Sequence, residues 1–149
     1  MSVFKTYGNG KRWLIPALFT FGMIIIFRTV LFIGYVPTVS MEPTVKAGSY
    51  VFGTRYVGEP EVGEIIVFHR DGQLIVKRIA GVPGDQINLS ELFYMTTLPI
   101  PVWEKNVITV PENCYFVLGD NTENSIDSRY WADKFVKKTD IVAKLIVNN

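Results

Sequence analysis

The chain has 149 residues, of which 48% are hydrophobic and 19% are charged, and its formal net charge is +1. A near-neutral chain without a basic stripe has no general attraction to phosphate backbones, which argues against a nucleic-acid partner. Part of the apolar excess is concentrated before residue 36, and this indicates contact with a lipid bilayer. The one cysteine, Cys114, cannot form an internal disulfide, so it neither supports nor excludes an extracytoplasmic location.

An apolar segment near the N-terminus has the length and the flanking charges of a membrane anchor. Residues 13–33 are interrupted only by Arg28, which can reach the headgroups, and a span needs roughly 20 residues. Three cations precede the segment, Lys5, Lys11 and Arg12. The positive-inside rule therefore predicts that residues 1–12 are cytoplasmic and that residues 34–149 form a domain outside the membrane.

Two alternatives to a retained anchor use the same apolar residues. A cleaved signal peptide has the same charge pattern, but no small-x-small cleavage site directly follows the apolar run. A buried core helix has no need of three preceding cations. We therefore expect a retained single span, with residues 32–39 leaving the membrane as extended chain because Pro37 blocks a helix.

Beyond the anchor, apolar runs alternate with turns rich in glycine and proline. Strands are predicted at residues 50–56, 86–89, 107–110, 114–118 and 140–147, and residues 64–79 are predicted to form a hairpin around Asp71-Gly72. Residues 91–106 have no assigned role, although Pro99 and Pro101 exclude a long helix there. Many short strands without an internal repeat predict a mainly β fold, an all-β domain with one N-terminal transmembrane helix.

Ser40, in the run Thr38-Val39-Ser40-Met41-Glu42-Pro43-Thr44, is the candidate nucleophile, and it needs a base to take its proton. The single histidine, His69, is predicted to lie at the hairpin tip in solvent. Lys77 is the better base, because strand alternation places Ile75 and Ile79 beside it on one face. Burial there disfavours the ammonium form and lowers the pKa of the lysine.

Cys114 offers a different nucleophile, and with His69 it suggests a thiol transpeptidase. The residues around Cys114 contain nothing that would activate a thiolate. We expect Cys114 to act as a small buried hydrophobic residue.

Three segments, residues 39–44, 76–85 and 119–129, resemble in order the sequence boxes of type I signal peptidases. The resemblance is to the small, Gram-positive-like bacterial forms and extends from about residue 11 to residue 147. It implies a signal-peptidase-like β domain that uses Ser40 and Lys77 as a catalytic dyad, without a metal or other cofactor. It also implies signal peptides of secreted preproteins as substrates, cut after small residues at the outer face of the cytoplasmic membrane, close to the secretion translocon.

The resemblance further implies roles for residues around the dyad. Ser125 would contact and orient Lys77, Asp127 and Arg129 would form a structural pair, and Asp120 would support the site from the same segment. The Thr38 hydroxyl would join the Ser40 N–H in an oxyanion hole, where each donor is worth about 100- to 1,000-fold in turnover. The family usually has Arg-Asp where this chain has Thr122-Glu123. The contacts that the family's arginine makes at this position are therefore not expected here.

Two other functions share parts of this pattern. A self-cleaving repressor-type Ser-Lys protease resembles the same fold and dyad, but it would carry a DNA-binding module where this chain has an apolar segment. A non-catalytic homologue that serves as an assembly factor, for instance in pilus formation, would tend to lose the serine or the lysine. Both residues are present in this chain.

Overall fold

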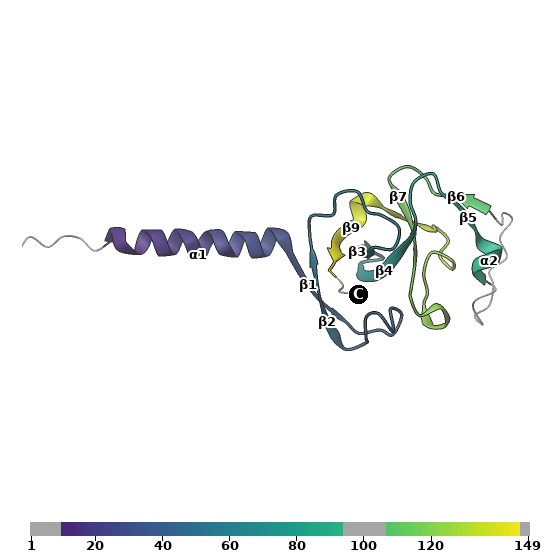
Figure 1. Cartoon of the computed structure of the whole chain (residues 1–149), viewed down its shortest axis with the longest axis horizontal. Helices are drawn as coiled ribbons and strands as arrows, with labels where there is room; N and C mark the ends of the chain where they lie inside the picture. The colour runs from purple at the N-terminus through teal and green to yellow at the C-terminus, as the bar shows by residue number, and fades with distance from the viewer. Residues whose placement is uncertain (1–9, 94–106, 147–149) are drawn as a thin grey trace, which may run out of the picture.

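The computed structural model describes residues 10–93 and 107–146. It comprises an N-terminal helix, α1 (Gly10–Val30), followed by a domain built mainly of antiparallel strands. Figure 1 shows α1 projecting away from the strands and joined to them through β1 (Leu31–Val36). The predicted fold class, a mainly β domain with one N-terminal helix, is confirmed.

Helix α1 is apolar enough to cross a membrane from Trp13 to Val30, and none of that window is buried against the rest of the described chain. The predicted anchor extended to Ile33, but the helix ends at Val30 and the next residues belong to β1. The reason is strand pairing, because Leu31 to Val36 pair with residues 54 to 49 of the neighbouring strand. Phe32 is consequently buried in the domain core instead of facing lipid.

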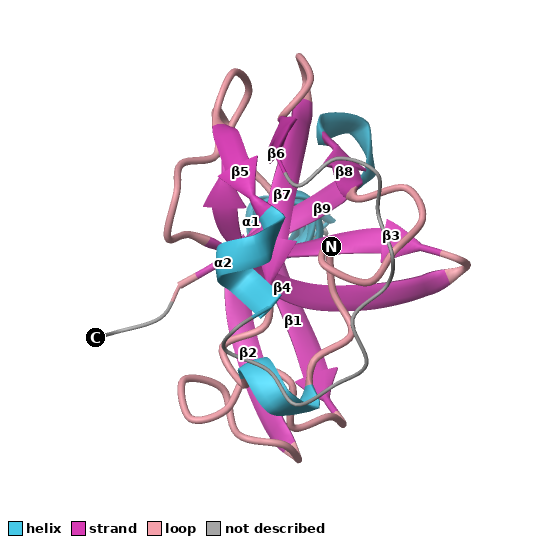
Figure 2. Cartoon of the chain, turned by 90° about the vertical axis from the view of Figure 1, so that its right-hand side faces the viewer, coloured by secondary structure: helices cyan, strands magenta, loops and turns pink. Residues whose placement is uncertain are grey.

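The main sheet has seven strands in the order β1-β2-β9-β3-β4-β7-β8, and a second sheet pairs β5 with β6. The remaining strands are β2 (Ser49–Thr54), β3 (Ile65–Arg70), β4 (Gln73–Gly81), β5 (Gln86–Asn88), β6 (Val107–Thr109), β7 (Cys114–Leu118), β8 (Phe135–Lys137) and β9 (Ile141–Leu145). A short helix, α2 (Leu89–Phe93), and two 3-10 turns, η1 (Thr122–Asn124) and η2 (Lys138–Asp140), complete the described elements. Figure 2 shows α2 close to the β5–β6 sheet.

The β3–β4 hairpin forms where the sequence predicts it. Asp71 and Gly72 adopt positive φ angles of 50° and 75°, as a tight two-residue hairpin turn requires. His69 is exposed near the tip. The register places Ile66 opposite Lys77, so the middle of β4 lies between two paired neighbours, β3 and β7.

Among the described residues, the core consists of three clusters of buried apolar side chains. The cluster nearest the middle of β4 contains Ile66, Phe68, Ile79, Tyr115, Val117 and Val136. Ile75 packs against it as a partly buried neighbour, so residues on both sides of Lys77 contact apolar material. The face of β4 that carries Lys77 is therefore shielded from water.

Several elements differ from the sequence predictions. β8 and α2 were not predicted, because each is very short and lacks a distinct period. β9 runs only from Ile141 to Leu145 within the predicted 140–147. Cys114 is half-buried, not buried, since it lies at the first residue of β7 near the edge of its cluster. Of the unassigned stretch 91–106, residues 94–106 lie outside the described residues.

Candidate active site

Ser40 and Lys77 meet in a buried site. Ser40 lies in the turn that follows β1, and Lys77 lies in the middle of β4. The Lys77 ammonium nitrogen Nζ lies 2.7 Å from Ser40 Oγ, a direct hydrogen bond. The exposed fraction is 8% for Ser40 and 3% for Lys77. A short contact between a serine hydroxyl and a shielded amine is the geometry needed for proton transfer between them.

The environment of Lys77 favours its neutral form. Burial lowers its pKa from 10.5 to about 8, with desolvation as the largest cause. The Asp127 carboxylate opposes this shift, and the Arg129 guanidinium adds to it. At pH 8 about half of such a lysine is neutral, whereas a free lysine is almost wholly charged.

Asp127 is the centre of a buried hydrogen-bond network behind the pair. Its Oδ2 atom accepts hydrogen bonds from Ser125 Oγ at 2.7 Å and from the Gly119 N–H at 2.9 Å. Arg129 donates to both carboxylate oxygens, each at 2.9 Å. Because Asp127 and Arg129 are 0% and 1% exposed, their charges compensate each other in a dry environment.

Ser125 differs from what the family resemblance implies. Its hydroxyl donates to Asp127, and within residues 10–93 and 107–146 no hydrogen bond joins it to Lys77. The Arg129 side chain also reaches the Thr122 carbonyl oxygen at 3.2 Å. The acceptor that this segment offers to Arg129 is thus a backbone carbonyl.

Asp120 is held by an arginine adjacent to the candidate base. Arg78 donates to Asp120 Oδ1 and Oδ2 at 2.7 and 2.6 Å, and to the Gly63 carbonyl at 2.6 Å. The guanidinium lowers the pKa of Asp120 against the opposing effect of burial. Arg78 is not among the predicted site residues. The signal in the sequence is a cation within a predicted strand, because such a charge requires a counterion when the strand is partly buried.

Thr38 lies at the edge of the site. Its Oγ1 atom is 3.4 Å from Ser40 Oγ, and the residue is exposed. The hydroxyl is therefore next to the candidate nucleophile.

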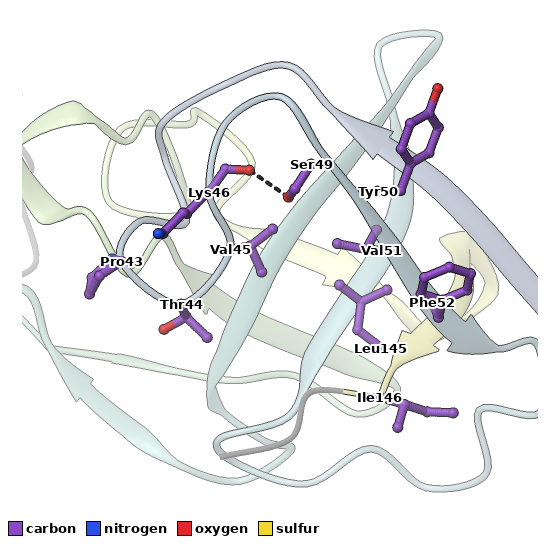
Figure 3. A pocket seen from close by; sticks show the side chains of 10 residues that line it. All are labelled: Pro43, Thr44, Val45, Lys46, Ser49, Tyr50, Val51, Phe52, Leu145 and Ile146. Atoms are coloured by element: carbon purple, nitrogen blue, oxygen red, sulfur yellow. Dashed lines mark hydrogen bonds between the residues drawn. The ribbon is translucent and has the colours of Figure 1, made fainter.

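A separate groove is lined by part of the segment that follows Ser40. Figure 3 shows Pro43 to Lys46 facing β2, with Leu145, the last residue of β9, and Ile146, which follows it. Its volume is about 370 Å³, and its lining includes neither Ser40 nor Lys77. Ser49 Oγ donates to the Lys46 carbonyl at 2.6 Å and closes the turn at one end.

The buried Ser40–Lys77 pair lies in a β domain that follows an apolar helix. A family model described as "Signal peptidase, peptidase S26" matches residues 10–95 and 93–148. The chain therefore belongs to the signal peptidase family, peptidase S26, a family of hydrolases. The predicted resemblance to type I signal peptidases is confirmed.

Curated relatives agree with the family model. The chain is 32% identical to Probable signal peptidase I-2 of Synechocystis sp. over 133 residues, which cover 76% of this chain and 60% of that relative. It is 32% identical to Signal peptidase I S of Bacillus subtilis over 140 residues, covering 78% of this chain and 76% of the relative. Signal peptidase I of Bacillus licheniformis is 30% identical over 143 residues, with coverage of 79% and 77%. These relatives, together with helix α1, indicate a membrane-anchored protein.

Proposed function

We propose that this chain is a membrane-anchored serine endopeptidase that removes N-terminal signal peptides from exported preproteins. Family membership supports signal-peptide cleavage as the activity. The observation that carries the mechanism is the 2.7 Å hydrogen bond between Lys77 Nζ and Ser40 Oγ in a shielded site. Substrates carry small residues one and three positions before the cut, as the family resemblance implies.

In the proposed reaction, neutral Lys77 takes the hydroxyl proton as Ser40 Oγ attacks the scissile carbonyl carbon. The tetrahedral intermediate collapses when the C–N bond breaks, and Lys77 returns the proton to the departing amine. The signal peptide is then held as an ester on Ser40. A water molecule, deprotonated by Lys77, attacks the carbonyl carbon of this ester. The bond between that carbon and Ser40 Oγ breaks, Lys77 returns the proton to Oγ, and the peptide leaves as a free acid.

The oxyanion that forms in each step needs hydrogen-bond donors. We assign this role to the Ser40 N–H and the Thr38 hydroxyl, whose Oγ1 atom is 3.4 Å from Ser40 Oγ. Asp127, Ser125 and Arg129 do not touch the reacting atoms in this scheme. They stabilise the segment beside Lys77. The charges of Asp127 and Arg129 also act on the pKa of the Lys77 amine.

The membrane arrangement completes the proposal. Helix α1 spans the bilayer with residues 1–12 in the cytoplasm and residues 34–149 outside, close to the secretion translocon. Because β1 follows α1 without a linker, Ser40 lies near the outer membrane surface. A signal peptide that is itself embedded in the bilayer would present its cleavage site at that level.

The test is cleavage of a purified preprotein by the full chain in detergent. Wild type should release the signal peptide, and both Ser40→Ala and Lys77→Ala should lower the rate by about 1,000-fold or more. Ser49→Ala is the matched control, because the Ser49 hydroxyl, at the first residue of β2, donates to the Lys46 carbonyl and contacts neither Ser40 nor Lys77. Its rate should equal that of wild type. Full activity of Ser40→Ala would contradict the proposal, and an inactive but folded wild type would favour a non-catalytic assembly factor.

A further inference from the structure

Asn121 binds the backbone of the nucleophile segment at two successive carbonyls. Its backbone N–H donates to the Ser40 carbonyl at 3.1 Å, and its side-chain Nδ2 donates to the Val39 carbonyl at 3.2 Å. The second contact joins residues 82 positions apart in the sequence. Asn121, in the loop after β7, thus hydrogen-bonds both peptide units that flank the Cα atom of Ser40.

These two contacts fix the direction of the Ser40 N–H. The peptide bond between Val39 and Ser40 is trans, so its N–H points opposite to its carbonyl. Because the Val39 carbonyl is held by Asn121 and by the Glu42 N–H at 3.0 Å, the Ser40 N–H faces away from the loop. Within the described part of the chain this N–H has no hydrogen-bond acceptor, so it is available to an incoming oxygen.

Asn121 is itself held in place from several directions. Asn124 Nδ2 donates to Asn121 Oδ1 at 3.1 Å, which orients the amide so that its nitrogen faces Val39. The Asn124 N–H also donates to the Asn121 carbonyl at 3.1 Å, at the start of η1. The preceding residue, Asp120, is held at two atoms by Arg78, whose neighbour is the candidate base. The loop that grips the Ser40 backbone is therefore tied to the strand that carries Lys77.

We infer that Asn121 is a positioning residue of the reaction, which aims the Ser40 N–H at the developing oxyanion. This inference rests on the proposed function, since it concerns the same site. Of the two donors of Asn121, the side-chain amide carries this role, because it contacts the peptide unit that contains the Ser40 N–H. Without it, only the short-range bond from the Glu42 N–H holds that peptide unit, and the Ser40 N–H is fixed less firmly in direction.

The experiment compares wild type with Asn121→Leu and Asn121→Asp in the full chain in detergent. Leucine is similar in size and has no donor, and aspartate has the same shape but places an acceptor against the Val39 carbonyl. Both variants should lose about 10- to 100-fold in kcat with KM within about threefold, because the oxyanion exists only after the attack. Glu123→Leu is the matched control, since Glu123 is an exposed residue of the same turn. It should retain wild-type kcat.

A second readout separates positioning from general support of the fold. The probe is a peptide aldehyde with alanine as the aldehyde-bearing residue and again two residues before it. Ser40 Oγ adds to the aldehyde carbon, and the aldehyde oxygen then occupies the oxyanion position. Its inhibition constant should rise by the same factor as kcat falls in the Asn121 variants. The thermal midpoint and the binding of uncleaved substrate to a Ser40→Ala background should change little. Unchanged aldehyde affinity, or a loss seen only in KM or in the midpoint, would overturn the inference. Failure of the proposed function would instead appear in wild type itself.

Discussion

Gly119 and Ser125 approach so closely that no side chain fits between them. A Cβ atom added to Gly119 would lie 2.1 Å from Ser125 Oγ and 2.6 Å from the Ser40 carbonyl oxygen. The second contact is to backbone, which cannot rotate away as a side chain can. Gly119 therefore brings the nucleophile segment and the Asp127 network into direct contact.

Gly119→Ala should damage both stability and activity. The added methyl group must displace the Ser40 carbonyl, which we expect to cost about 1–3 kcal/mol and to move Ser40 Oγ relative to Lys77. A displacement on the order of 1 Å at a reacting atom reduces turnover by about 100-fold. Thermal unfolding and initial-rate assays measure the two effects.

Gly22→Ala serves as the control for that substitution. A Cβ added at Gly22, within α1, meets no atom within 4 Å. This variant should match wild type in both assays. If Gly119→Ala also matched wild type, the close packing of Gly119 against Ser40 and Ser125 would be contradicted.

Lys77 should destabilise the folded protein at neutral pH. Its pKa is about 8 in the folded state and 10.5 in the unfolded state, so folding opposes protonation of this amine. The free-energy cost of burying the charged amine is about 3 kcal/mol. It applies in full below about pH 8 and disappears as pH rises through 10.5.

Lys77→Met removes the ionisable group and keeps an unbranched apolar chain. At pH 7 the variant should unfold at a higher temperature than wild type, and the difference should shrink between pH 8 and pH 10. Thermal unfolding at several pH values measures it. A difference that stays constant with pH would show that the amine is not desolvated in the folded protein.

Thr38 is expected to contribute a donor to the oxyanion. Thr38→Val should lower kcat and leave KM nearly unchanged, because that charge develops only in the transition state. Thr38→Ser retains the hydroxyl and should recover most of the turnover. An unchanged kcat in Thr38→Val would remove this hydroxyl from the site.

The orientation of α1 can be tested by cysteine labelling. In a Cys114→Ser background, a cysteine at Ser2 should be protected from an impermeant reagent in intact cells, and one at Asn149 should react. Both sites should react after the membrane is permeabilised. Labelling of the Ser2 site in intact cells would contradict a cytoplasmic N-terminus.

Local patterns were sufficient for the parts of the fold that depend on neighbouring residues. Asp71-Gly72 predicted the β3–β4 turn, and alternation along β4 predicted that Lys77 lies between Ile75 and Ile79 on one face. Ser40 could be singled out only with the help of the family resemblance. The turn and the alternation depend on residues that are close together in the sequence, whereas the resemblance depends on three segments between residues 39 and 129.

Contacts between distant segments were not predictable in the same way. Leu31 to Ile33 are as apolar as the helix before them, and only their pairing with β2 assigns them to a strand. The hydrogen bond from Asn121 to Val39 joins residues 82 positions apart in the sequence, and the Arg78–Asp120 pair joins residues 42 positions apart. No local period encodes such contacts, because they depend on how the strands are ordered in the sheet.

Neutral Lys77 is proposed to activate Ser40, and the pH dependence of kcat/KM reports the ionisation of this amine in the free enzyme. With a pKa of about 8, the neutral fraction of Lys77 is about 1% at pH 6, 10% at pH 7 and 90% at pH 9. The profile of the free enzyme should therefore rise about tenfold per pH unit below pH 7 and level off above pH 9. Lys77→Arg should be inactive throughout, because a guanidinium stays protonated. A flat profile from pH 6 to pH 9, or appreciable cleavage by Lys77→Arg, would contradict the assignment of Lys77 as the base.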